Sequence, residues 1–170
     1  MIKYFFIGLL LSSLFSCKSI SISLIDKGST PEEWQSFSIK TLENAAPNCP
    51  LNLPVQLSES LKDGLQNNTR LELNTETGSG EVYIEGVINE YSVVPVAVQN
   101  ENTAAQNRLT ISVQFDIFIS KPKEEKMALR STRFADFNSN TNLAELENDL
   151  IEEINEQIVQ DLINKLLSNW

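Results

Sequence analysis

Six basic side chains gather around one loop of this sequence, and they are the residues best suited to chemistry. Ammonium and guanidinium groups bind phosphates and carboxylates, so the cluster is a candidate contact for lipid phosphates or for a partner's acidic side chains. Asp116, Glu124 and Glu125 lie among them, and the alternative is that they form ordinary surface ion pairs, which contribute little. The six candidates are Arg108, Lys121, Lys123, Lys126, Arg130 and Arg133.

Residues that usually perform catalysis are scarce. The chain contains no histidine and two cysteines, so the commonest general base and the commonest ligands of zinc and copper are missing. Glu152, Glu153 and Glu156 lie in a predicted helix, where adjacent side chains point about 100 degrees apart and cannot share a substrate. Residues 78–80 lack the rest of a phosphate-binding loop and predict a turn. We therefore expect no enzyme, no metal and no cofactor, and a carboxylate-dependent hydrolase would need two acidic residues facing one cleft.

The N-terminus has the pattern of a secretory signal. Residues 1–16 contain a short charged region and an apolar stretch that is too short to span a bilayer, which needs about 20 apolar residues. The segment from Leu14 to Cys17 resembles the lipobox of bacterial lipoproteins, which predicts cleavage before Cys17 and a covalent lipid on its sulfur. The alternative is a secreted protein cut near Ser16. Once Cys17 is lipidated, Cys49 has no disulfide partner, and we interpret it as a free structural thiol.

The charge of the chain restricts its partners. The sequence has 13 basic and 23 acidic residues, and removal of Lys3 with the signal leaves residues 17–170 at a net charge of -11. Such a surface disfavours nucleic acid as a partner. The length of this segment is that of one domain, which we expect to span residues 17–170.

Alternating and helical patterns predict the elements that position the basic residues. Residues 81–98 are extended, with Val82, Ile84, Ile88 and Val94 on one parity, and Pro95 should end the strand or lie at an edge or bulge because it cannot donate to a ladder. The hydrophobicity pattern further predicts strands at 19–24, from Trp34 towards Pro47, at 70–73, at 108–120 and at 127–137, a hairpin loop at 121–126, and helices from Pro54 to Asn67 or Asn68 and from Leu143, capped by Asn142, to about Leu167.

The order of these elements predicts the fold class. Strands separated by two helices favour an α+β two-layer sandwich, in which both helices pack on one face of a largely antiparallel or mixed sheet. In segment 108–120 the side chains of Leu109, Ile111 and Val113 alternate with polar ones. Helices on the dry face of this strand would leave its polar face open to water or to a hydrophilic partner.

Three longer segments resemble a known family. "EGVINEYSVVPVAVQNENTAAQNRLTISVQF", "STRFADFNSNTNL" and "LIEEINEQIVQDLINKLLSNW", together with the lipobox, are similar to the LptE type of lipopolysaccharide (LPS) assembly lipoprotein of Gram-negative bacteria. The resemblance implies a sheet with two helices, no catalytic activity, and an outer-membrane lipoprotein facing the periplasm. It also implies a partner, the β-barrel LptD, whose lumen the protein plugs and whose assembly it assists. Some family members are proposed to bind LPS through basic residues, and here the residues near the 121–126 loop are the candidates.

The short distance between Cys17 and the strand predicted at 19–24 implies a short tether. Stable anchoring takes two or more acyl chains, each methylene contributing about 0.8 kcal/mol, so the domain would stay at the membrane. Lys18 and Ser19 carry neither an inner-membrane retention aspartate nor an acidic surface-export signal. The leading hypothesis is therefore a non-catalytic plug and assembly partner of a barrel. The alternative is a lipid-anchored module that carries a glycolipid or scaffolds another envelope complex, and it predicts LPS binding weakened by substitution of Lys123 and Arg133.

Overall fold

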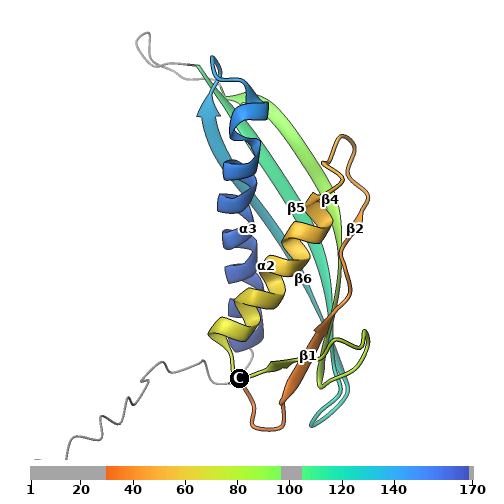
Figure 1. Ribbon diagram of the computed structural model, residues 1–170. Coiled ribbons are helices and arrows are strands. Elements are labelled where there is room, and N and C mark those ends of the chain that lie inside the picture. Colours follow the sequence, from red (N-terminus) through yellow and green to blue (C-terminus); the bar gives the residue numbers. More distant parts are fainter. Residues whose placement is uncertain (1–29, 97–104, 169–170) are drawn as a thin grey trace, which may run out of the picture.

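Two helices pack on one face of a mixed sheet in the computed structural model of the chain, which describes residues 30–96 and 105–168 (Figure 1). The α+β two-layer fold predicted from the sequence is thereby confirmed. The signal at 1–16, Cys17 and the strand predicted at 19–24 lie outside the described residues. The elements are β1 Ser36–Ile39, β2 Glu43–Asn44, α2 Leu53–Asn68, β3 Glu72–Leu73, β4 Val82–Val96, β5 Gln106–Ile119, β6 Glu125–Asn138 and α3 Leu143–Leu167.

The sheet combines parallel and antiparallel pairing in the order β3-β1-β4-β5-β6, with β2 also paired to β4. β1 runs parallel to β3 and β4, and the chain crosses over through α2 between them. Parallel neighbours need such a crossover, whereas β4, β5 and β6 are antiparallel and follow one another along the chain. The three long strands form the part of the sheet that carries the predicted basic cluster.

Alternation along β5 defines the two faces of the sheet. Leu109, Ile111, Val113, Phe115, Ile117 and Ile119 are all buried under the helices. On β6, the residues opposite them in the register include Met127 and Ala135, which are also buried. The side chains between them point to the other side, as the period of two predicts.

A bulge changes the alternation of β4. Ile88 pairs with Val113 and Glu90 pairs with Ser112, so Asn89 is the extra residue. After the bulge Tyr91 faces the helices, and its hydroxyl donates to Glu147 Oε1 on α3 at 2.6 Å. The prediction that Val94 shares the dry face of Val82 is therefore wrong, because one unpaired residue reverses the parity of everything that follows. Pro95 lies at an edge as predicted, since this half of β4 pairs with β5 alone among the described strands.

The two helices form where the sequence predicts them. α2 has Pro54 in its first turn, where the missing N–H costs nothing, and it ends at Asn68. Asn142 caps α3 by accepting the N–H of Ala144 at 3.2 Å, and the apolar stripe of α3 is buried. The helices approach closely at Gly64, where a β-carbon on this glycine would lie 2.2 Å from Val159 Cγ1. Within the described residues, neither helix has the length and apolarity required to cross a bilayer.

Candidate interaction face

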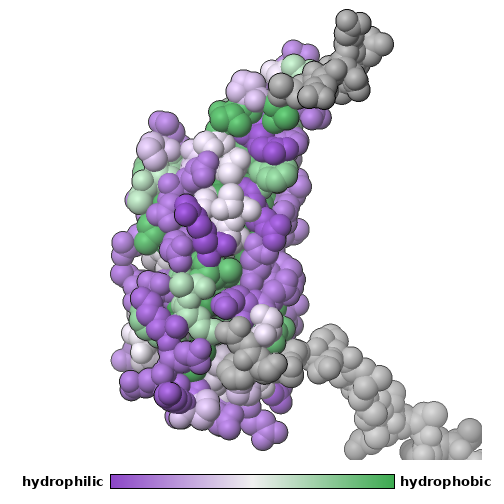
Figure 2. All heavy atoms as spheres, turned by 180° about the vertical axis from the view of Figure 1, so that it is seen from behind, coloured by the Kyte–Doolittle hydropathy of each residue, from purple (hydrophilic) through white to green (hydrophobic). Residues whose placement is uncertain are grey.

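The side of β4, β5 and β6 that faces away from the helices is the candidate site, and we call it the open face. Figure 2 shows this side as mostly hydrophilic side chains, with hydrophobic ones gathered in limited areas. Three of the six predicted basic residues lie on this face. Directly opposed residues of neighbouring strands share a face, so the register of β5 and β6 identifies them. Arg108 pairs with Asp136, Arg130 with Gln114, and Lys126 with Phe118.

A charged and aromatic cluster occupies the end of the open face near residue 136. Arg108 forms two hydrogen bonds with Asp136, from Nε to Oδ1 at 2.7 Å and from Nη2 to Oδ2 at 2.8 Å. The same guanidinium lies over the ring of Phe134, with Cζ 3.7 Å from the ring centre. Its hydrogen bonds and charge lower the pKa of Asp136. Phe134 is 48% exposed and Val94, opposite Arg108 on β4, is 47% exposed, so apolar surface borders an ion pair.

The middle of the open face is polar and carries one exposed cation, Arg130. Ser112 and Thr132, directly opposite each other, have their hydroxyl oxygens 2.8 Å apart. Arg130 Nε donates to Ser112 Oγ at 3.4 Å, and Arg130 forms no ion pair with any residue in the described ranges. Its guanidinium is exposed and remains able to bind an anionic group.

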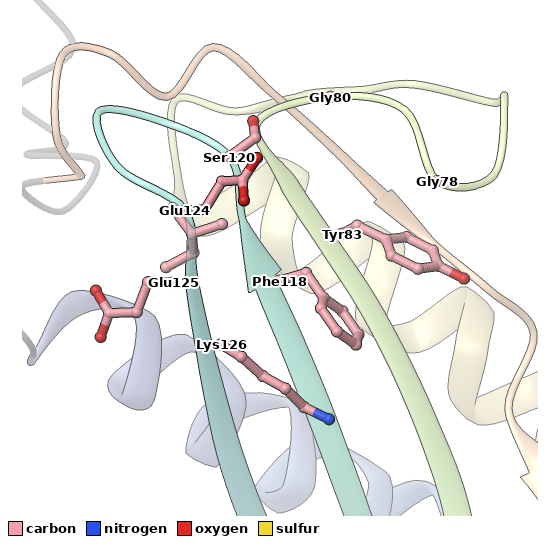
Figure 3. Close-up of a pocket in the computed structure, with 9 residues that line it drawn as sticks. Gly78, Gly80, Tyr83, Phe118, Ser120, Glu124, Glu125 and Lys126 are labelled. Atoms are coloured by element: carbon pink, nitrogen blue, oxygen red, sulfur yellow. The ribbon is translucent and has the colours of Figure 1, made fainter.

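An aromatic hollow lies at the other end of the open face, beside the β5–β6 hairpin. Tyr83 and Phe118 stack with ring centres 5.8 Å apart, and Lys126 Nζ lies 5.0 Å from the Phe118 ring and 3.1 Å from Asp116 Oδ2. Figure 3 shows the side chains of Tyr83, Phe118 and Lys126 projecting from neighbouring strands. The hollow has a volume of about 470 Å³ and Ser120 also lines it. Rings with a nearby ammonium offer apolar, cation–π and charged contacts together.

The other three predicted basic residues are placed elsewhere. Lys121 and Lys123 lie in the hairpin loop, where Lys121 pairs with Glu81 at 3.0 Å and Lys123 has no ion pair among the described residues. Glu81 also accepts from the backbone and hydroxyl of Ser36, and Lys121 lowers the pKa of Glu81 to about 2. Arg133 lies on the helix side, where it binds Asp161 of α3 and lowers its pKa. The six basic residues thus do not form one cluster: three lie on the open face, two in the hairpin loop, and Arg133 contacts α3.

Sequence reasoning missed the aromatic members of the open face. Phe118 and Phe134 occupy polar-parity positions of their strands, which is the signal that would have found them. Among the residues that the structure describes, no group of three or more histidine, cysteine or carboxylate side chains is placed to hold a metal ion. Burial raises the pKa of the Cys49 thiol, so it is a poor nucleophile.

The fold and this face define a class, a two-layer α+β domain in which the two described helices cover one side of the sheet. The chain belongs to the LptE family, because the family model described as lipopolysaccharide-assembly matches residues 34–166. No curated protein matches the sequence.

Two solved structures share the fold at low sequence identity. The hypothetical protein CT253 from Chlamydia trachomatis is similar with a TM-score of 0.57 and 14% identity, over 80% of this chain and 99% of that one. Protein XCC0632 from Xanthomonas campestris gives 0.51 and 10%, over 78% and 84%. A third structure, the uncharacterized lipoprotein B from Nitrosomonas europaea, gives 0.49 and 16%, over 79% and 83%.

Proposed function

We propose that this member of the LPS-assembly family is an outer-membrane lipoprotein that plugs the barrel LptD, assists its assembly and supports LPS transport. A lipid on Cys17 holds it at the inner leaflet of the outer membrane, facing the periplasm. The observation that carries the proposal is the open face, where polar and charged side chains cover a long three-stranded surface on the side away from both described helices. The lumen of a large membrane barrel is polar, so it suits this surface.

The contact chemistry favours a protein wall over a uniformly anionic surface. Arg108 and Lys126 already have carboxylate partners, while Arg130 and Lys123 have none among the described residues. The two available cations that the structure places on the open face and its hairpin allow local pairing with a partner's carboxylates, but a strongly acidic chain does not allow broad attraction to anionic lipid. Phe134 adds apolar contact area beside the Arg108 ion pair.

A photo-crosslinker at Ala128, an exposed residue of β6 on the open face, tests this proposal in intact cells. We expect capture of LptD, identified by mass spectrometry, and about tenfold less capture when Arg130→Glu reverses the available charge. Arg70→Glu is the matched control, because Arg70 is exposed, lies outside the open face and forms no ion pair within the described ranges. Lipidated, abundant protein that captures no LptD from Ala128 would contradict the proposal.

The second candidate is a lipid-anchored module that carries a glycolipid or scaffolds another envelope complex. The hollow at Tyr83 and Phe118 favours the glycolipid version, because stacked rings suit sugar groups and Lys126 beside them can exchange Asp116 for a phosphate. Glu124 and Glu125 also line the hollow, so the phosphate contact within it falls to Lys126 alone. Purified protein should then bind LPS saturably, and Lys123→Ala and Lys126→Ala should weaken binding in a salt-dependent manner. Arg133→Ala, which the sequence alone predicts to weaken binding, should instead leave it unchanged, since its guanidinium binds α3 and does not face the hollow.

A further inference from the structure

The two helices form a cleft on the side of the molecule opposite to the open face. They are in tight contact at Gly64 and Val159 and splay apart towards their N-termini (Figure 1). A hollow of about 420 Å³ lies one to two helical turns from that contact, towards the N-termini of both helices. Its lining includes Gln56 and Ser60 of α2 and Asn155 of α3. We call this hollow the helix cleft.

Asn155 gives the helix cleft an unsatisfied hydrogen-bond acceptor. The residue is 4% exposed, and its side-chain Oδ1 is buried without a hydrogen-bond partner among the described residues. A buried acceptor without a donor destabilises the fold, so such groups in native proteins usually meet a ligand, a partner or water. The missing group at this position must carry an N–H or O–H.

The rim of the helix cleft selects a cation among the possible donors. Glu152 is exposed, lies one turn from Asn155 on α3 and forms no ion pair within the described part of the chain. Glu59 also lines the cleft, although Lys62 reaches it at 2.7 Å. Of the residues placed by the structure, no lysine or arginine lines the cleft itself. An incoming ammonium or guanidinium would meet both an acceptor and a carboxylate, whereas an anionic lipid headgroup would be repelled.

Apolar surface at the mouth fits the stem of a long cationic side chain. Val55 of α2 is 54% exposed and gives the mouth its apolar surface, while the buried Ile151 lines the cleft on α3. Lysine and arginine place an aliphatic stem against apolar surface and a hydrogen-bonding charge at its end. This combination of acceptor, carboxylate and apolar mouth matches one lysine or arginine side chain.

We propose that the helix cleft binds a lysine or arginine side chain presented by a partner protein, with the cationic head pairing with Glu152 and the buried Asn155 side chain turning so that its Oδ1 accepts from that head. The site goes beyond the proposed function, because it gives the domain a second protein contact on its helix side. It does not depend on which protein covers the open face.

A photo-crosslinker at Gln56 in the lipidated full-length chain, activated in intact envelopes, tests the inference. We expect a crosslinked peptide of one partner protein with a lysine or arginine within two residues of the crosslink. Glu152→Lys should lower the yield about tenfold, and charge reversal of that partner residue should restore it. Glu153→Lys is the matched control with the same charge change, since its side chain points about 100 degrees away on the helix.

A second variant separates binding from folding. Asn155→Leu removes the unsatisfied acceptor, so the urea midpoint of the purified chain should stay equal or rise while capture from Gln56 falls by about tenfold. Unchanged capture by Asn155→Leu, a crosslink to a peptide without a basic residue, a crosslink to a second copy of this chain, or no crosslink would each overturn the inference. If Ala128 still captures LptD in those cases, the helix cleft proposal fails while the proposed function stands.

Discussion

Arg130 and Arg133 lie three residues apart on β6, yet they occupy chemically different faces of the same sheet. Arg133 binds Asp161 on α3, with Nε donating to Oδ2 at 2.8 Å, and Ser131 Oγ donates to the same oxygen at 2.5 Å. On the open face, Arg130 reaches a neutral partner, the hydroxyl of Ser112. Arg133, which lies on the helix side, therefore holds α3 against the sheet, while Arg130 on the open face remains available to a partner.

The largest difference in stability between the two faces is expected for adjacent residues of β5, one of which points to the helices and the other to the open face. Phe115→Ala removes a fully buried ring from under the helices and should lower the free energy of unfolding by about 3–5 kcal/mol. Gln114→Ala, on the open face, should cost less than about 1 kcal/mol. Urea unfolding followed by circular dichroism measures both. Equal losses would mean that the open face is covered in the free protein.

The second prediction compares one arginine–aspartate pair from each face, Arg133 with Asp161 on the helix side and Arg108 with Asp136 on the open face. Asp161→Ala should destabilise by about 2 kcal/mol, because it deletes hydrogen bonds from Ser131 and Arg133 at a side chain that is 19% exposed. Asp136→Ala should change the urea midpoint less, since water solvates the freed Arg108 beside Phe134. A larger loss for Asp136→Ala than for Asp161→Ala would reverse the assignment of structural and available faces.

The smallest expected effect is a change in how stability depends on pH, caused by the Glu81–Lys121 pair beside the β5–β6 hairpin. Glu81, held by Lys121, has a pKa lowered from 4.5 to about 2, so its stabilisation is complete above pH 4.5 and is lost as the pH falls towards 2. Glu81→Gln should be less stable at neutral pH and should lose less stability over that interval. Lys121→Met should move the loss to higher pH. Urea midpoints at several pH values measure these shifts, and curves parallel to that of the unchanged chain would contradict the role given to the pair.

Much of the fold follows from local pattern. The six alternating apolar residues of β5 and the stripe of α3 predict their elements because burial of one face dominates the energetics of both. Pairing order does not follow in this way, because β1 lies beside β4 through a crossover that depends on packing of the whole chain. The bulge at Asn89 was also unpredictable, since nothing in the local sequence marks which residue is left without a partner.

The candidate site was predictable in part. Proximity in sequence groups the six basic residues, and counting parity along residues 125–138 is enough to separate Arg133 from Arg130. The ion pairs required tertiary information, because Asp161 comes from α3 and Glu81 precedes β4. The helix cleft could not be predicted from the sequence, since Asn155 is one polar residue among many in a long amphipathic helix.

The extra residue at Asn89 has a consequence for how related chains are aligned. A homologue that lacks this one residue would keep its counterpart of Tyr91 opposite Ile111 and facing α3, because deleting the bulged residue restores regular alternation without changing the pairs that follow. An alignment that leaves this gap out of the strand would then equate inward with outward side chains along the rest of it. Substitution patterns in this half of β4 become interpretable only when insertions and deletions are assigned to Asn89 itself.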